Sequence, residues 1–344
     1  MDATTVGVDL AKNVFEIALA DERGHIFDRQ RLTRARFDRF FGNRPACHIV
    51  MEACGSAHHH ARRLRDQGHE VCLLPAQYAR AYVRRNKTDA ADAAALIEAA
   101  RCPDIRPVPI KSVDQQALQQ LHRLRSQWMG ARTSRLNFLR GCLREFGLSV
   151  PLGPRRAIGA VRDALADVAS PVPTLLHSSL LELLNEIDSL EQRCKQLDRE
   201  LKRLHEHDPV IDRLLKIPGV GDLTATALRA SVVDIQRFPS ARHFASYLGL
   251  TSREHSSGER RRLGRISKQG DPYLRTLLIH GARSVLLAAR SAQRRGLTLD
   301  RLRTWALDVQ ERRGHNKATV ALANKLARIV WATWRHERDF TSHP

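Results

Sequence analysis

Residues 4–20, TTVGVDLAKNVFEIALA, hold two short stretches of apolar residues that are separated by a turn at residues 11–13. Their content of β-branched and aromatic residues favours β-strands at Thr5–Asp9 and Val14–Ala20. A turn at residues 21–24, Asp-Glu-Arg-Gly, leads into a third expected strand at His25–Leu32. The chain is therefore predicted to begin with three strands joined by short turns.

Helices and strands alternate in the residues that follow. We expect a helix near Ala35–Phe41, a strand at His48–Ala53, a helix at about Ala57–Gln67, a strand at Glu70–Leu74 and a further helix that begins close to Asp89. This order predicts an α/β domain at the amino terminus.

Four acidic residues of this domain lie on predicted strands and at the start of a predicted helix. Asp9 and Glu52 lie on predicted strands, and Asp89 and Asp92 are three residues apart, which places them on one face of a helix. Carboxylate oxygens are the ligands that Mg²⁺ prefers. Taken singly, each acid is more simply a helix cap or a charge at a strand end. The four together favour a metal site that acts on nucleic-acid phosphates.

The composition indicates the class of partner. The chain has 57 Lys and Arg against 37 Asp and Glu, a formal charge of +20, and residues 208–344 alone hold 25 basic against 12 acidic residues. A basic surface of this kind is typical of a protein that binds phosphate backbones. No apolar run approaches the roughly 20 residues of a membrane-spanning helix, and the first residues do not have the layout of a signal peptide. A cytoplasmic protein without membrane partners is expected.

Cysteine and histidine spacing argues against other metal sites. The six cysteines form no C-x-x-C pair, so neither a structural zinc nor a disulfide framework is expected. The run His58–His60 points its side chains about 100° apart on a helix, so the three cannot converge on one ion.

The middle of the chain is expected to be helical. A helix is predicted at Gln115–Phe146, and the proline-rich residues 147–175 are interpreted as a hinge or linker. Beyond them, apolar residues form a heptad seam: Leu176, Leu180, Leu183, Ile187, Leu190, Cys194, Leu197, Leu201 and Leu204. We favour pairing of this seam between two chains. The alternative is an antiparallel partner within the chain, such as Gln115–Phe146.

Residues 214–225, LLKIPGVGDLTA, are interpreted as a helix-hairpin-helix turn. Gly219 and Gly221 would permit the tight turn, and the following helix would offer free N–H groups to a phosphate. Such a turn binds backbone without reading sequence. A plain connection between two helices, ended by glycine, is the alternative.

Ser267 lies in a polar, basic loop before a predicted helix. Asp271 is a natural N-cap of that helix and Pro272 suits its first position, so Ser267 is not needed as a cap. The nearby cations favour a bound phosphate: Arg260, Arg261, Arg262, Arg265 and Lys268. A serine in such a loop is more often a hydrogen-bond donor to phosphate than a nucleophile, so the residues alone leave both roles open.

Six sequence motifs follow one another along the chain: VGVDLAKNVFEIA, MEACGSAHH, RRNKTDAADAAAL, IPGVGDLTATALRA, FASYLGLTSREHSSG and GRISKQGDPYLRTLLIHGARS. Together they resemble the DEDD insertion-sequence transposases, relatives of the Piv-like DNA invertases and of RuvC-type nucleases. The resemblance implies a ribonuclease-H-like (RuvC-like) domain at residues 1–110, a helical and coiled-coil region at 111–207 and a helical transposase domain at 208–344.

The resemblance also implies functional roles. In that family the four acids, which map to Asp9, Glu52, Asp89 and Asp92, hold one or two Mg²⁺ ions. A serine that matches Ser267 attacks DNA and forms a transient phosphoserine link. A non-coding guide RNA pairs with donor and target DNA, and dimers or tetramers bring acids and serine together. A bacterial, nucleoid-associated protein is implied.

Two other functions remain possible from the sequence. One is a hydrolytic RuvC-like Holliday-junction resolvase or nuclease, which would need the acids and a water but no serine. The other is a nucleic-acid-binding assembly protein whose acids are inactive.

Overall fold

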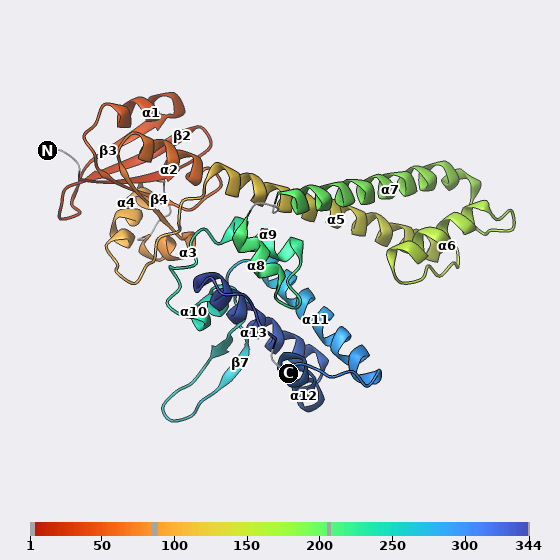
Figure 1. Ribbon diagram of the computed structural model, residues 1–344. Helices are drawn as coiled ribbons and strands as arrows, with labels where there is room; N and C mark the ends of the chain where they lie inside the picture. Colours follow the sequence, from red (N-terminus) through yellow and green to blue (C-terminus); the bar gives the residue numbers. More distant parts are fainter. Residues whose placement is uncertain (1–3, 84–88, 205–207, 343–344) are drawn as a thin grey trace. The chain divides into compact units, whose positions relative to one another are not determined.

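A computed structural model describes residues 4–83, 89–204 and 208–342, without the side chain of Asp89. The chain divides into two compact units, Met1–Val113 and Asp114–Pro344 (Figure 1). The finer division into domains at 1–110, 111–207 and 208–344 stays a prediction.

The first unit is built on a five-stranded sheet with the strand order β3-β2-β1-β4-β5. β1 pairs antiparallel with β2 and parallel with β4, β2 pairs antiparallel with β3, and β5 runs parallel to β4. The strands are β1 (Thr5–Leu10), β2 (Val14–Ala20), β3 (Ile26–Thr33), β4 (His48–Glu52) and β5 (Glu70–Leu74). The predicted α/β class and the ribonuclease-H-like strand order are confirmed.

Helices cover both faces of this sheet, which explains why its central strands are apolar on both sides. On one face, α1 (Arg34–Gly42) and α2 (Ala57–Asp66) pack on a core that includes Val6, Val8 and Phe15. On the other face, Val50 and Ala18 pack against α4 (Asp89–Ala100). The short helix α3 (Ala76–Ala79) and a 3₁₀ turn at Arg80–Tyr82 lie between β5 and α4 in the chain.

The second unit begins with two long helices that lie side by side, α5 (Val113–Glu145) and α7 (Thr174–Arg203) (Figure 1). The order of their ion pairs makes them antiparallel, since residue numbers rise on α5 as they fall on α7. The pairs are Arg125–Asp198 at 2.5 Å, Arg132–Glu191 at 3.1 Å and Arg135–Glu186 at 2.7 Å.

The prediction that the heptad seam pairs between chains was wrong. Leu180, Ile187 and Leu197 are buried within a single chain, and part of the seam shares a core with Leu136 and Leu139 of α5. The seam is therefore closed by an antiparallel partner within the chain, which was the alternative to pairing between two chains.

The proline-rich segment 147–175 is also more ordered than a hinge or linker. It contains α6 (Pro154–Ala166), which starts with Pro154 at its first turn after Gly153 with φ +93°. Ala157 and Val161 of this helix are buried in the same core as Leu184. Prolines and glycines mark the ends of the helix, as their missing N–H and free φ favour.

The remaining elements of this unit form a helical bundle with one β-hairpin. They are α8 (Pro209–Leu215), α9 (Asp222–Ser231), α10 (Ala241–Tyr247), β6 (Ser252–Glu254), β7 (Leu263–Ile266), α11 (Pro272–Arg294), α12 (Arg301–Arg313) and α13 (His315–Arg335). α13 carries many buried apolar residues and packs against α10, α11 and α12. Within the described ranges, no helix is long and apolar enough to cross a membrane.

Candidate active site and nucleic-acid interface

The two strand acids lie side by side at one end of the sheet. β1 and β4 are parallel and Val8 pairs with Met51, so the next position on each strand places Asp9 beside Glu52. Because side chains alternate between the faces of a strand, Asp9 shares its face with Gly7 and Glu52 with Val50. That face is the one covered by α4.

Gly7 lets α4 approach the sheet closely. A Cβ atom at this position would lie 2.3 Å from the carbonyl oxygen of Ala93 and 2.9 Å from the side chain of Ile97. Asp92 directly precedes Ala93, so this backbone contact fixes the height of Asp92 above the strand that carries Asp9. The glycine is thus needed for close packing of helix on strand.

Asp9, Glu52 and Asp92 line one cavity of about 410 Å³. All three side chains are half-buried. The other lining residues come mainly from α3, the 3₁₀ turn and α4: Ala76, Ala79, Arg80, Val83 and Leu96. The structure therefore brings together three of the four acids that the sequence singled out.

The donor chemistry of this cavity suits a hydrated divalent cation. Its acidic groups are carboxylates, and Mg²⁺ keeps several waters, so it needs only a few protein oxygens. Among the described side chains, no three carboxylate, imidazole or thiol groups are placed to hold an ion directly. Asp89 starts α4 one turn before Asp92, but its side chain lies outside the described residues.

Arg80 is a site residue that the sequence reasoning missed. It is exposed and lines the acid cavity beside the three carboxylates. The sequence pattern predicts no element between the strand at Glu70–Leu74 and the helix of Asp89, whereas α3 and the 3₁₀ turn give this wall a defined backbone. A guanidinium at the mouth of an acidic cavity can bind a phosphate oxygen.

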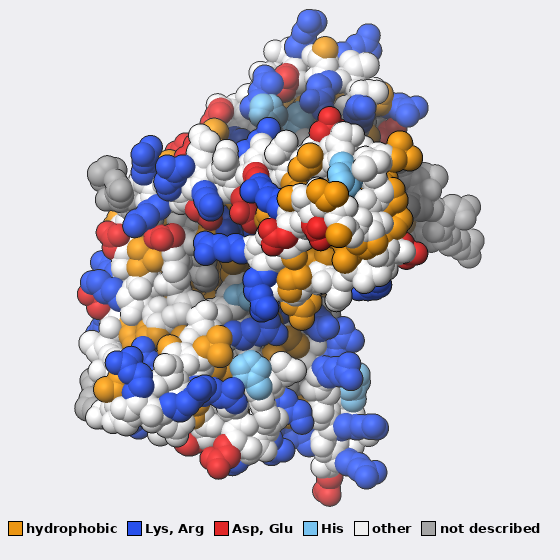
Figure 2. All heavy atoms as spheres, turned by 90° about the vertical axis from the view of Figure 1, so that its right-hand side faces the viewer, with side chains coloured by type: hydrophobic (Ala, Val, Ile, Leu, Met, Phe, Trp, Pro, Cys, Tyr) orange, Lys and Arg blue, Asp and Glu red, His pale blue; other side chains and the backbone are white. Residues whose placement is uncertain are grey.

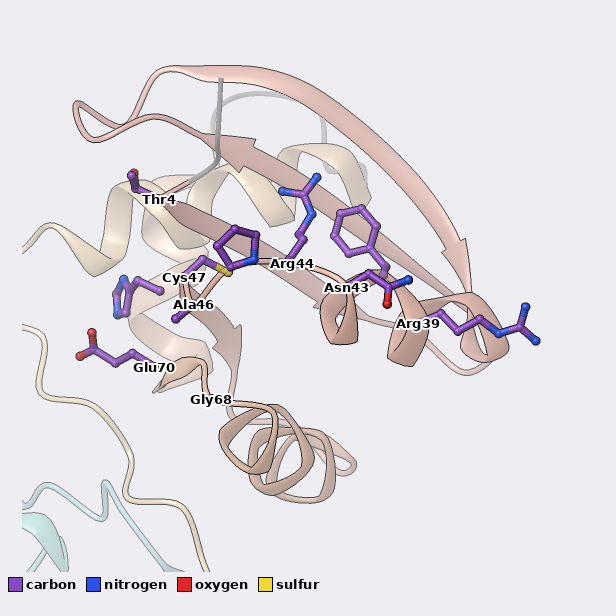
Figure 3. A pocket seen from close by; sticks show the side chains of 11 residues that line it. Thr4, Arg39, Asn43, Arg44, Ala46, Cys47, Gly68 and Glu70 are labelled. Atoms are coloured by element: carbon purple, nitrogen blue, oxygen red, sulfur yellow. The ribbon is translucent and has the colours of Figure 1, made fainter.

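A larger hollow of about 870 Å³ lies at the opposite end of the sheet (Figure 3). It is lined by the amino ends of strands, among them Thr4, His48 and Glu70, whereas the acids lie at the carboxyl ends of β1 and β4. Arg44 beside it stacks over Phe40 at 4.4 Å. Glu70 is the one acid among the described residues that line this hollow, so it offers a metal ion fewer carboxylates than the smaller cavity does.

The histidine run does not converge, in line with the helical geometry expected for it. Nδ1 of His58 accepts a hydrogen bond from the backbone N–H of Lys111 at 3.3 Å, His59 is exposed, and His60 is buried between Phe15 and Phe37. Burial, first of all, lowers the pKa of both His58 and His60 to about 4.

Ser267 directly follows β7 and is held by backbone contacts. Its N–H donates to the carbonyl of Thr251 at 2.8 Å, and its Oγ accepts from the N–H of Gln269 at 3.4 Å. The side chain of Asp271 accepts from the N–H groups of Tyr273 and Leu274, which confirms it as the N-cap of α11. Ser267 is thus free of any capping duty and stands half-buried between hairpin and helix.

Tight turns on both sides anchor the serine loop. Lys268 has φ +55°, and Gly249 and Gly270 also have positive φ. A Cβ at Gly270 would lie 1.9 Å from the carbonyl oxygen of Tyr247, and one at Gly249 would lie 2.0 Å from that of Gln269. The loop after Ser267 therefore packs directly on the loop that precedes β6.

The cations around Ser267 differ in part from those expected. Arg260–Arg262 lie between the two strands, at the far end of the hairpin, because residues 252–266 form a hairpin rather than an open loop. Arg253, on the paired strand β6, does reach the serine backbone, because its guanidinium donates to the carbonyl of Ser267 at 3.1 Å. Arg275 donates to the carbonyl of Gln269 at 3.3 Å. The pairing of Ser252 with Ile266 brings Arg253 close to Ser267. The two residues are far apart in the sequence, so the sequence alone did not predict this contact.

The glycines of the α8–α9 turn have different surroundings. A Cβ at Gly219 would lie 2.8 Å from the carbonyl oxygen of Gly281 on α11, so this glycine serves the packing of two backbones. Gly221 is exposed and precedes the first residue of α9, and a Cβ added to it would meet no described atom within 4 Å. On the side where a Cβ would stand, Gly221 therefore has open space and Gly219 has none.

Two family models match the chain. Residues 6–147 match the DEDD transposase model of IS110, and residues 211–296 match the model described as transposase IS116/IS110/IS902 family. A protein of Pseudomonas aeruginosa described as a probable family 20 transposase is 43% identical over 98% of each chain. The chain belongs to the IS116/IS110/IS902 family of transposases.

Two further proteins are similar to the chain over different lengths. The transposase for insertion sequence element IS1111A of Coxiella burnetii is 37% identical over 98% of this chain and 92% of that protein. The pilin gene-inverting protein of Moraxella bovis is 30% identical over 42% of this chain and 44% of that protein. The resemblance seen in the sequence is confirmed: the chain is a transposase, an enzyme that cleaves and joins DNA, and its DEDD domain implies a divalent metal.

Proposed function

We propose that this transposase cleaves and rejoins DNA with Asp9, Glu52, Asp89 and Asp92 as metal ligands and Ser267 as nucleophile. The observation that carries the metal half is the shared cavity of Asp9, Glu52 and Asp92, at the carboxyl ends of neighbouring parallel strands and the first turns of α4. Asp9 and Asp92 are the ends of a stretch of 84 residues, and only the fold brings them into the same cavity.

One or two Mg²⁺ ions bound there would neutralise charge on the scissile phosphate. The carboxylates would hold the ions, and Arg80 at the cavity wall would bind a non-bridging phosphate oxygen. The close contact of Gly7 with Ala93 would keep the acids of strand and helix at a constant separation.

Ser267 would attack phosphorus with its Oγ. The Oγ–P bond forms, the bond from phosphorus to the 3′ oxygen breaks, and the proton of the hydroxyl ends on that 3′ oxygen. The phosphodiester energy is retained in the serine link, so a 3′-hydroxyl of another end can reverse the step and join DNA. Oγ accepts a hydrogen bond from the N–H of Gln269. The hydroxyl proton takes no part in that bond, so a base can remove it.

Donor and target DNA would be held largely through their phosphates. Figure 2 shows Lys and Arg side chains over much of the face that it displays. We propose contacts from the hairpin and its neighbours, namely Arg260, Arg261, Arg262, Arg265, Lys268, Gly219 and Gly221. For Gly219 the contact would come from the side of the turn that faces away from Gly281.

A guide RNA and a dimer or tetramer complete the proposal. The large positive charge supports a second nucleic acid, bound mainly through backbone and shape. Oligomer contacts are supported by the end of the α5–α7 hairpin, where Leu152, Val168 and Leu175 are each more than 80% exposed. Figure 2 shows hydrophobic side chains on the part of the molecule that faces the viewer, which includes this end. The heptad seam, being buried within the chain, does not supply these contacts.

The deciding experiment traps the reaction on a nicked suicide DNA that carries the element's ends. The wild-type chain is expected to form a covalent adduct that mass spectrometry maps to Ser267. Ser267→Ala should bind DNA normally and form none, and Asp9→Asn should bind DNA and not cleave it. Ser284, whose hydroxyl donates to the carbonyl of His280 within α11, supplies a matched control, Ser284→Ala, that should react normally.

A hydrolytic nuclease of the RuvC type is the competing function, since the acid cavity alone would support it. In that case water attacks phosphorus and no adduct forms. Free 5′-phosphate ends in Ser267→Ala at the wild-type rate would establish this alternative and end the proposal for the serine.

A further inference from the structure

The carboxy-terminal bundle contains a cleft of about 1540 Å³, larger than either cavity of the first unit. Its walls come from α10, the β6–β7 hairpin and α13, with Ile279 of α11 and Trp305 of α12. Ile266 and Lys268 both line it, so Ser267 lies at its edge. Arg261, Arg265 and Lys268 of its lining are among the DNA contacts proposed above, but the lining residues of α10 and α13 have no role so far.

The lining of the cleft is strongly cationic. Basic side chains reach it from three elements and two loops, among them Arg242, Arg265, Lys268, Lys317, Lys325 and Arg328. Among the described residues, Glu254 is its one acidic lining residue. This carboxylate already accepts a hydrogen bond from Ser256 at 2.7 Å and lies 3.6 Å from the guanidinium of Arg261. Such an excess of positive charge in one concavity is complementary to a polyanion.

Apolar side chains form the floor between these cations. Leu250, Ile266, Val320 and Ile329 line the cleft together with the ring of Trp305. Duplex DNA presents sugars and phosphates to a protein surface and keeps the faces of its bases stacked inside. An unpaired strand, by contrast, offers base faces to apolar and aromatic groups while its phosphates stay charged. The combination of cationic rim and apolar floor therefore fits a single strand better than a duplex.

Lys325 joins the cationic and the apolar parts of this lining. Its amino group lies 4.0 Å from the ring centroid of Trp305. Desolvation, Arg328 and Arg301 each disfavour the charged form and lower the pKa of Lys325. A bound phosphate would compensate both the lost hydration and the repulsion between these cations.

We propose that this cleft binds one unpaired DNA strand beside Ser267, with its phosphates on the basic rim and a base on the apolar floor. DNA is the strand we favour because the family cleaves and joins DNA and because the serine stands at the cleft's edge. The inference rests on the proposed function for its purpose, which is to hold the strand end next to the nucleophile. Binding itself does not require the serine to react.

The test compares single-stranded and duplex binding by the full chain. The probes are a fluorescent oligothymidylate of about 12 nucleotides, the duplex of the same length and the matching oligouridylate. The cleft variant is Lys317→Glu with Arg328→Glu, since both side chains are exposed and line the cleft. The matched control is Arg294→Glu with Arg313→Glu, two exposed arginines that do not line it.

The cleft variant should lose about tenfold or more of its affinity for oligothymidylate, with the salt slope flatter by about 1.4, and lose much less for duplex. The control should change all probes alike and by less. Photo-crosslinking of 5-iodouracil in the strand should label Trp305. Equal losses for single strand and duplex, or a crosslink elsewhere, would overturn the inference, as would a clear preference for oligouridylate.

Two further results keep this inference apart from the proposed nucleophile. Ser267→Ala should bind oligothymidylate as well as wild type does, whatever happens to the covalent adduct. If the adduct forms but the cleft variant binds strand normally, the cleft inference alone fails. If strand binding needs the cleft but no adduct forms, the nucleophile proposal alone fails.

Discussion

Gly7→Ala tests whether the contact between β1 and α4 sets the geometry of the acid cavity. The new Cβ would stand 2.3 Å from the backbone oxygen of Ala93, with Ile97 at 2.9 Å on its other side. Since the nearest atom belongs to the backbone, no change of rotamer relieves the overlap. The helix must move away by about 1 Å to restore ordinary van der Waals contact.

That movement should affect chemistry more than stability. Overpacking of this size costs about 1–3 kcal/mol, which leaves a folded unit with a lower melting temperature. Asp92 would move with the helix, while Asp9 and Glu52 stay on the sheet. A misplacement of about 1 Å in a catalytic constellation lowers the rate by about a hundredfold. DNA affinity should hardly change, because the basic surface of the second unit is untouched.

The assay measures Mg²⁺-dependent cleavage of the element's DNA alongside thermal unfolding and DNA binding. Gly130→Ala in α5 is the matched control, since its Cβ would meet nothing within 4 Å, and alanine should stabilise that helix by about 0.5–1 kcal/mol. Wild-type cleavage in a folded Gly7→Ala protein would refute the reasoning. It would show that the acids tolerate a displaced α4.

Three other predictions follow from buried groups. His60→Leu should stabilise the first unit by about 1 kcal/mol or more, measured by urea unfolding. The reason is that both ring nitrogens of His60 are buried without a hydrogen-bond partner among the described residues. A loss of stability would contradict this prediction. Burial and Arg125 lower the pKa of His122 to about 4, below the value near 6.5 of the unfolded chain. The neutral ring therefore makes its full contribution to the free energy of unfolding above about pH 6.5, and this contribution falls by up to about 3 kcal/mol as the pH drops towards 4. His122→Gln should flatten the pH dependence of the free energy of unfolding between these two pH values. An unchanged profile would exclude His122 as the source of that dependence. Leu197→Asp should destabilise the α5–α7 hairpin by about 3 kcal/mol or more, seen as lost helicity in circular dichroism, whereas a change of molecular mass with full helicity would restore the seam to a role between chains.

Local signals predicted much of the first unit. Its central strands are apolar on both faces, and the turns between them are short, so strand order followed from the sequence and from the family resemblance together. The N-cap at Asp271 was also predictable, because an acceptor followed by proline has a local meaning. The convergence of Asp9, Glu52 and Asp92 depended on register between strands far apart in the chain, and the resemblance supplied what periodicity could not.

Other features had no local signal. A heptad seam shows that a helix needs a partner, but its own residues do not say which one. The answer lay in Arg125, Arg132 and Arg135 of α5, which pair with acids spaced along α7 in reverse order. The β6–β7 hairpin was missed because its strands are almost wholly exposed, so that no alternation of apolar and polar residues marks them. Hence Arg253 was missed as well.

A series of buried hydrogen bonds joins α5 of the α5–α7 hairpin to the start of α11, which follows the loop of Ser267. The hydroxyl of Thr226 donates to the carbonyl of Asp222 at 2.6 Å, so it accepts from Nε2–H of His122 at 3.1 Å. Nδ1 is then the acceptor for the hydroxyl of Tyr273 at 3.0 Å. Only the neutral ring satisfies both ends, which agrees with its lowered pKa.

These hydrogen bonds link α5, α9 and the first turn of α11. Tyr273 stands two residues after Asp271, the N-cap of α11 at the end of the serine loop. A displacement of α5 at His122 must therefore move Tyr273 or leave a buried polar group without a partner, at a cost of about 1–3 kcal/mol. The position of the α5–α7 hairpin and the position of the serine loop are for this reason energetically coupled. The assembly proposed above, through the exposed end of the α5–α7 hairpin, would thus have a physical route to Ser267 that does not pass through the acid cavity.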